Sequence, residues 1–210
     1  MPIESIRLPI SNARVHVALY CQVSNARQLR QRLVSASQSG DANLRAEVDF
    51  SFIDASMLTS RVHLWTAVAH ALVADAYGTL KSNTLHSEVI SMLDPGSNIS
   101  EALKHFGLSP TTTDLVVVRV CPSRNSNPSD DDSNDDDAVA SAIASIVQGE
   151  ITPLDLIGDL PDGRTNDKSL RKVYKLNGDV ALSRLTPRSR EYRRTLDQLV
   201  TSSVALKSVS

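Results

Sequence analysis

Residues 158–165 have the glycine spacing of a phosphate-binding loop, with Arg164 where such a loop usually carries lysine. A loop of this kind binds phosphate through backbone N–H groups that point inward at the start of a helix. Pro161 removes one of those donors, and the carboxylates of Asp159 and Asp162 would repel phosphate. No helical pattern follows the segment. We therefore predict a turn here and no nucleotide site.

The histidines and cysteines are the other candidates for catalytic or metal-binding groups. His63 and His70 are seven residues apart on a predicted helix and share a face, but no carboxylate lies between them and the zinc motif H-E-x-x-H is absent. Neither Cys21 nor Cys121 has a histidine nearby in sequence, and no serine sits in a G-x-S-x-G motif. We expect structural histidines, no catalytic residue, no metal and no cofactor.

An aspartate-rich run covers residues 123–137 and contains six aspartates. A calcium-binding EF-hand loop needs glycine at its sixth position and glutamate at its twelfth. Counted from Asp130, those positions hold Asp135 and Ser141. With its serines, asparagines and prolines, the run is typical of a solvated segment, and we expect a disordered acidic loop.

The elements that would position any site follow from hydrophobic periodicity. Together they predict an α/β (α+β) fold, with a small mixed or antiparallel sheet of about four strands flanked by several helices. Residues 171–176 fit either an exposed basic strand or the entry of a helix. We expect one domain over residues 1–176 and a basic C-terminal extension over residues 177–210. Predicted strands cover residues 15–23, 48–53 and 115–120, and predicted helices cover residues 25–37, 57–77, 84–92, 99–106, 138–148 and 188–206.

Charge is distributed unevenly along the chain. Residues 1–163 carry 11 Lys and Arg against 20 Asp and Glu, a net charge of −9, whereas residues 164–210 carry 11 against 4, a net charge of +7. A basic end favours an anionic partner such as nucleic acid, although a solvated helix has the same composition. No signal peptide and no apolar membrane span is visible, so we expect a protein of the cytosol or nucleus.

Residues 79–107 have the most specific local pattern in the chain. Thr84 and Glu88 suit the first turn of a short helix, and residues 94–97 suit a turn. Asn98 can cap a second helix, with Glu101 completing a capping box and Gly107 as a left-handed C-cap. The apolar stripe of this two-turn helix can contact a partner or pack entirely inside the fold. It consists of Ile99, Ala102, Leu103 and Phe106.

This region resembles the signature of a known family. The sequences Lys-Ser-Asn-Thr-Leu-His-Ser-Glu over residues 81–88 and Asn-Ile-Ser-Glu-Ala-Leu-Lys-His-Phe-Gly over residues 98–107 are similar to those of the smallest core subunit of the KEOPS (EKC) complex, the PRPK-binding protein family. Residues 18–30 and 63–72 resemble the family's first strand and helix and its alanine-rich helix. The family usually has serine where this chain has Asp94, and the acidic run and basic C-terminus depart from its pattern.

The resemblance implies a non-catalytic subunit that binds and allosterically regulates a kinase-like ATPase subunit. It also implies that the chain contacts the remaining KEOPS subunits through that kinase and helps bind tRNA for threonylcarbamoyladenosine formation beside the anticodon. Roles in telomere maintenance and transcription, a nuclear and cytoplasmic location and a monomer within a hetero-oligomer follow by analogy. The expected kinase-docking residues are Asn98, Ile99, Ala102, Leu103 and Phe106.

For tRNA the matching basic positions are Lys81, Arg171, Lys172 and Lys175, because phosphate contacts dominate affinity for nucleic acid. Two other functions stay open from the sequence. One is a stand-alone enzyme, for which no phosphate loop or acid–base pair is visible. The other is a stand-alone RNA-binding module that uses the basic C-terminal region.

Overall fold

Contacts within the chain divide it into two compact units, each made of two separate stretches. The computed structural model describes residues 3–9, 12–39, 41–121 and 132–207. The first unit comprises Met1–Asp54 and Gly107–Leu154, and the second comprises Ala55–Phe106 and Asp155–Ser210. The chain therefore passes from one unit to the other three times.

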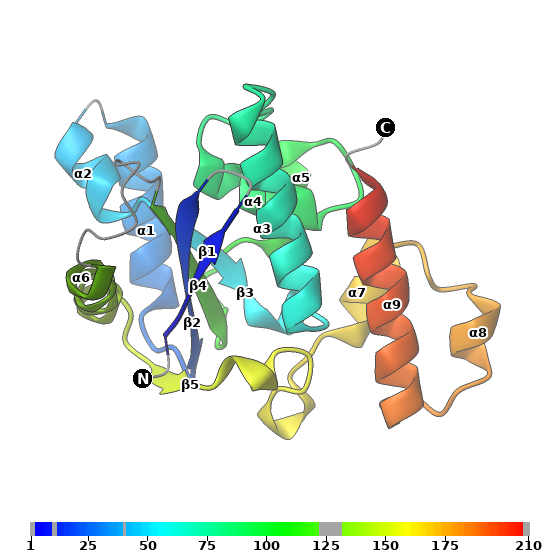
Figure 1. Cartoon of the computed structure of the whole chain (residues 1–210). Coiled ribbons are helices and arrows are strands. Elements are labelled where there is room, and N and C mark those ends of the chain that lie inside the picture. Colours follow the sequence, from blue (N-terminus) through cyan, green and yellow to red (C-terminus); the bar gives the residue numbers. More distant parts are fainter. Residues whose placement is uncertain (1–2, 10–11, 40, 122–131, 208–210) are drawn as a thin grey trace. The chain divides into compact units, whose positions relative to one another are not determined.

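The described strands of the first unit form one antiparallel sheet, ordered β1–β2–β4–β3, with β5 also pairing with β2 (Figure 1). The central strands β2 and β4 are nearly continuous runs of buried apolar residues, as expected where both faces of a sheet are covered. The predicted α+β class with an antiparallel sheet is confirmed. The strands are β1 (Glu4–Leu8), β2 (Ala13–Cys21), β3 (Ser51–Asp54), β4 (Leu115–Cys121) and β5 (Glu150–Thr152).

Helices α1 (Ala26–Gln38) and α6 (Asp132–Ile146) cover one face of this sheet, and α2 (Ala42–Glu47) follows α1 (Figure 1). Asn25 directly precedes α1, and its side chain makes no cap there. Instead its amide donates to the carbonyl of Ile146 at 2.8 Å and accepts from the backbone N–H of Gln148 at 3.0 Å. Asn25 thus joins the start of α1 to the end of α6. The core beneath these helices includes Tyr20, Leu29, Phe52, Val117, Ile143 and Val147.

The acidic run differs from its predicted conformation. Helix α6 begins at Asp132, so the prediction of a disordered acidic loop over residues 123–137 is wrong for residues 132–137. Residues 123–131 of that prediction lie outside the described residues, which resume at 132. The buried side chains of Ile143 and Ile146 hold the helix on the sheet, and such tertiary packing outweighs the weak helix propensity of aspartate and asparagine.

Strand β3 receives extra backbone pairing on its outer edge. The N–H of Leu108 donates to the carbonyl of Phe52 at 3.1 Å, and Gly107 forms an antiparallel bridge with Ile53. Gly107 therefore leaves α5 in an extended conformation, and the predicted left-handed C-cap is wrong. The chain ends the helix by joining the sheet edge.

The second unit consists of helices. Helix α3 (Arg61–Ala76) is capped by Ser60, whose hydroxyl accepts from the N–H of His63, and its buried alanines let α4 approach closely. Gly78 ends it at a φ of 64°, a left-handed conformation that favours glycine. The other helices are α4 (Leu85–Leu93), α5 (Ile99–Phe106), α7 (Asp167–Val173), α8 (Val180–Ser183) and α9 (Arg190–Leu206), with short 3-10 turns at Ala55–Met57, Leu154–Leu156 and Pro161–Gly163.

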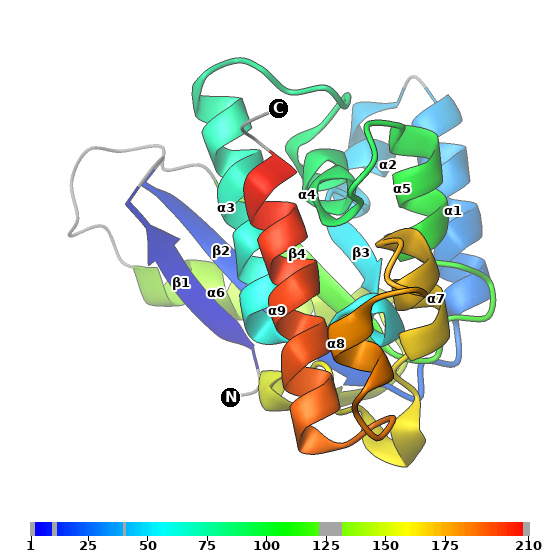
Figure 2. The same cartoon turned by 90° about the vertical axis from the view of Figure 1, so that its right-hand side faces the viewer.

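Helix α9 runs along α3 (Figure 2). It buries Tyr192, Leu196, Val200 and Val204, which recur every four residues and form one stripe. The amphipathic helix predicted over residues 188–206 is thereby confirmed, and it belongs to the second unit's core. The division into a domain over residues 1–176 and an extension over residues 177–210 stays a prediction.

Candidate partner-binding site

The loop before α4 is held by a buried carboxylate. Glu88, in the first turn of α4, has no exposed surface. Its Oε2 accepts hydrogen bonds from the backbone N–H of Lys81 at 3.1 Å and of Ser82 at 2.7 Å. Thr84 caps the same helix by accepting from the N–H of Ser87 at 3.1 Å. The sequence predicted the helix start but missed that Glu88 is buried and shapes the loop.

The turn between α4 and α5 is organised by Asp94. This carboxylate is 5% exposed and accepts from the backbone N–H of Gly96 at 2.7 Å. Its second oxygen lies 2.7 Å from Nδ1 of His105 on α5. One side chain therefore fixes both the turn and the approach of α5 to α4.

Helix α5 begins at the predicted cap Asn98, but the bond from the backbone N–H of Asn98 to Glu101 that a capping box requires is not found among the described residues. The side chain of Asn98 accepts from the N–H groups of Ser100 at 3.0 Å and Glu101 at 3.3 Å. The carboxylate of Glu101 lies 3.6 Å from Lys104 and 3.7 Å from His105. These charged side chains lie along the solvent-facing side of α5.

The apolar stripe of α5 is divided between the core and the surface. Ala102 and Phe106 are 1% and 0% exposed, so the prediction that they form part of a docking surface is wrong. They anchor the helix inside the unit. Leu103 is 39% exposed, Asn98 is exposed and Ile99 is half-buried. Of the five predicted docking residues, these three can reach a partner.

An aromatic cluster lies beneath α5. The rings of Phe106, His63 and Tyr174 meet edge to face, with centroids 6.0–6.4 Å apart. The hydroxyl of Tyr174 donates to the carbonyl of Leu93, so Nε2–H of His63, 2.9 Å away, donates to that hydroxyl. Burial lowers the pKa of His63 to about 3, and the imidazole is neutral. His63 is thus structural, as predicted.

The end of α4 is capped by a distant lysine. Nζ of Lys207 donates to the carbonyls of Ser91 at 2.5 Å and Asp94 at 2.7 Å. Burial lowers the pKa of this ammonium, and the carboxylate of Asp94 opposes that shift. The Lys207 contact joins the end of α9 to the turn that carries α5. No sequence spacing could have revealed a pair 113 residues apart.

The predicted tRNA-binding residues fall in two places within the second unit. Arg171, Lys172 and Lys175 lie at the end of α7, and Lys81 lies in the loop before α4. Arg171 is half-buried and donates to the carbonyl of Asn177 at 3.1 Å, which stabilises the turn after α7. Lys81, Lys172 and Lys175 are exposed.

Residues 158–165 form turns, as predicted. Gly158 has a φ of 87°, and an added Cβ would lie 1.9 Å from the carbonyl oxygen of Thr59, so close packing explains this glycine. Asp159 forms an ion pair with Arg193 of α9. A helix does follow the segment, because α7 starts at Asp167 after the cap Asn166. The expectation that no helix follows was therefore wrong.

Among the residues that the structure describes, no group of three or more His, Cys, Asp or Glu side chains could hold a metal ion. In the same residues, no helix is both long and apolar enough to cross a membrane.

Known proteins match most of the chain. The family described as "Kinase binding protein CGI-121" matches residues 20–208. An EKC/KEOPS complex subunit of Aspergillus fumigatus is 33% identical over 84% of this chain and 85% of its own length, and one of Neurospora crassa is 31% identical over 95% and 94%. An EKC/KEOPS subunit of Gibberella zeae is 30% identical over the full length of both chains. From this match and the geometry above, the chain belongs to the CGI-121 family of kinase-binding proteins.

Proposed function

We propose that this chain is a non-catalytic subunit of an EKC/KEOPS complex that binds and allosterically regulates the complex's kinase-like ATPase subunit. The observation that carries the proposal is the division of α5. Ala102 and Phe106 fix the helix from inside, while Leu103 presents an exposed apolar side chain. Apolar anchors of this kind commonly dominate the energy of an interface. Asn98 and Ile99 would complete the contact.

Leu103→Glu tests this proposal directly. Binding to the kinase-like ATPase subunit from the same genome, measured by calorimetry, should weaken at least tenfold because a charge would be buried against an apolar partner. Leu44→Glu is a matched control, since Leu44 on α2 is 41% exposed and lies in the first unit. A folded Leu103→Glu variant that binds like the wild type would refute this docking surface.

We further propose that the exposed cations Lys81, Lys172 and Lys175 help bind tRNA for threonylcarbamoyladenosine formation. Arg171 would contribute by holding the turn after α7. Each phosphate contact adds about 0.7–0.9 to the slope of log affinity against log salt concentration. Reversing all three lysines should therefore reduce that slope by about 2–3. Reversal of Arg27, Arg32 and Lys168, which are also exposed, is the control and should change it little.

The alternative is a stand-alone RNA-binding module that uses the basic C-terminal region. Under that hypothesis the exposed Arg190 and Arg194 on α9 would contact the RNA phosphates. If reversal of these two arginines abolishes tRNA binding while the triple lysine variant binds normally, the alternative is correct. Nuclear and cytoplasmic location and a role in telomere maintenance or transcription belong to the same proposal, and fluorescent tagging in cells would test the location.

A further inference from the structure

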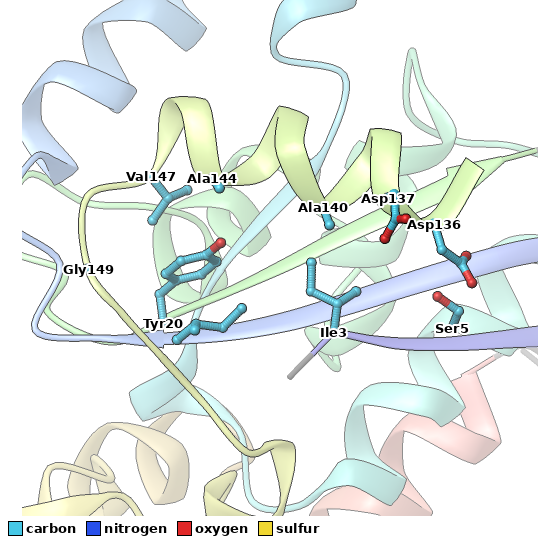
Figure 3. A pocket seen from close by; sticks show the side chains of 10 residues that line it. Ile3, Ser5, Tyr20, Asp136, Asp137, Ala140, Ala144, Val147 and Gly149 are labelled. Atoms are coloured by element: carbon cyan, nitrogen blue, oxygen red, sulfur yellow. The ribbon is translucent and has the colours of Figure 1, made fainter. Parts of the chain in front are cut away.

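A groove in the first unit lies between α6 and the strands β1, β2 and β5 (Figure 3). Its volume of about 680 Å³ lies within the range of roughly 300–1,000 Å³ that ligand pockets occupy. Ala140 and Ala144 are four residues apart on α6 and face the groove, so small side chains leave the space open. Apolar walls are completed by Ile3, Val147 and Ile151.

The two ends of the groove differ in chemistry. Figure 3 shows Tyr20, Ala144 and Val147 at one end, and Ser5, Asp136 and Asp137 at the other. A ligand that fills the groove would therefore have an apolar end and a polar end. Such a gradient favours an amphipathic, extended ligand.

Tyr20 carries an open hydrogen-bonding group. The residue is 4% exposed, and Figure 3 shows its hydroxyl directed toward α6. Among the described residues no hydrogen bond to this hydroxyl is found, and Tyr20 lines the open groove, so the hydroxyl is available to a ligand there. Burial raises the pKa of Tyr20, so the hydroxyl stays neutral and can donate. It is placed to bond a carbonyl oxygen of a ligand.

The polar end is acidic. Asp136 contacts Arg14 and lies 3.2 Å from Nδ1 of His16, with 35% of its side chain exposed. Asp137 beside it is exposed. Asp136 and Asp137 carry two negative charges at this end, against the one positive charge of Arg14. This excess of negative charge attracts a cation.

We propose that this groove binds an extended peptide segment of a partner protein, with apolar side chains near Tyr20 and lysine or arginine near Asp136 and Asp137. From Asp136 to Val147 the helix rises about 16 Å, the length of roughly five extended residues. β1 is the terminal strand of the sheet path, and terminal strands commonly pair with added peptide backbone. The groove shares no residue with the second unit, so this inference is independent of the proposed function.

A dye-labelled peptide of sequence Leu-Ser-Leu-Ser-Arg-Arg tests the proposal by fluorescence anisotropy with the full chain. Saturable binding with a Kd below about 100 µM is expected. Ala144→Trp fills the groove and should weaken binding at least tenfold. Ala142→Trp, on the same helix but outside the groove, should bind normally. Asp137→Lys should weaken binding most at low salt, whereas Glu150→Lys, outside the groove, should have little effect.

Three results would overturn the inference. The first is no saturable binding of the peptide to the wild-type chain. The second is that folded Ala144→Trp binds the peptide as tightly as the wild-type chain does, or that the wild-type chain binds a peptide with glutamates in place of the arginines equally well. The third is octylammonium binding as tightly as the peptide, which would assign the groove to small amphiphilic amines.

Discussion

At the scale of single residues, buried polar groups determine the conformation of residues 79–107. Glu88→Ala removes the acceptor of two backbone N–H groups, on Lys81 and Ser82. Each of these part-buried bonds contributes on the order of 1 kcal/mol, and the lost contacts of the buried carboxylate add to that. Urea unfolding should show a loss of about 2–4 kcal/mol, and the amides of Lys81 and Ser82 should exchange faster with solvent.

Glu88→Gln is the companion variant, because its side-chain carbonyl can still accept those bonds. Its loss of stability should be clearly smaller than that of Glu88→Ala. Equal losses in the two variants would mean that packing volume, and not hydrogen bonding to the loop, explains the role of Glu88.

His63 should make stability depend on pH. Its pKa is about 3 in the folded chain and about 6.5 when unfolded, so the unfolded state binds the proton more readily. The contribution of this pKa difference to the free energy of unfolding is fully present above pH 6.5 and decreases as the pH falls toward 3. The total loss is on the order of 5 kcal/mol by linkage. Urea midpoints at pH 7.5, 6 and 5 would measure it.

His63→Gln separates this effect from other titrations. Glutamine can still donate to the hydroxyl of Tyr174 but does not ionise in this range. The stability of the variant should fall less between pH 7.5 and 5 than that of the wild type. An unchanged slope would assign the acid sensitivity to other groups.

The sequence predicts those parts of the candidate site that depend on local hydrogen bonds, but not those that depend on packing between distant residues. Local patterns correctly gave the cap at Asn98 and placed Thr84 at the start of α4, because a cap bonds groups two or three residues away. The same patterns could not divide the stripe of α5, since periodicity identifies an apolar face but not what covers it. Phe106, for example, packs against His63 and Tyr174, which are distant in sequence.

At the scale of elements, Lys207 holds the end of α4 in place. Lys207→Met keeps most of the apolar stem but removes both donors to Ser91 and Asp94. We expect a loss of about 1–3 kcal/mol and faster amide exchange in the turn before α5. Lys172→Met, at an exposed position, should change stability by less than about 0.5 kcal/mol.

If Lys207→Met were as stable as the wild type, water would be able to replace Lys207 as the hydrogen-bond donor to the carbonyls of Ser91 and Asp94. Binding of the kinase-like subunit provides a second measurement. A looser turn should weaken it through α5, even though Lys207 itself need not touch the partner.

Strands β1 and β5 show why element prediction missed part of the sheet. β1 has a half-exposed sequence with Glu4 and Arg7, and β5 has three residues. Neither segment shows a strand pattern by itself. Each becomes a strand because β2 offers its backbone, Glu4–Leu8 opposite one part of β2 and Glu150–Thr152 opposite another. Nonlocal pairing of this kind leaves little trace in the local sequence.

At the scale of the whole molecule, the C-terminal region cannot be removed without cost. Residues 177–210 contribute five large side chains to the buried interior, Leu182, Tyr192, Leu196, Val200 and Val204. At about 1.5–3 kcal/mol each, their loss is on the order of 10 kcal/mol, comparable to the net stability of a typical domain.

Deletion of residues 177–210 should therefore abolish binding of both the kinase-like subunit and tRNA. Circular dichroism of the truncated chain should show a loss of helix beyond that of α8 and α9. A truncated chain that keeps a sharp unfolding transition and still binds the kinase would show that α9 is dispensable for the second unit.

The passage of the chain between its two units also sets the order in which they can be completed during synthesis. The first unit has all its residues once position 154 has been made, whereas the cap on α4 requires Lys207. Translation adds roughly 5–20 residues per second, so α3 to α5 wait seconds on the ribosome for α9. A polypeptide interrupted before its last turns would carry a finished sheet, but α5, the helix proposed to dock the partner, would lack its support. Ribosomal stalling near the 3′ end of the message would thus yield chains that the kinase-like subunit does not capture.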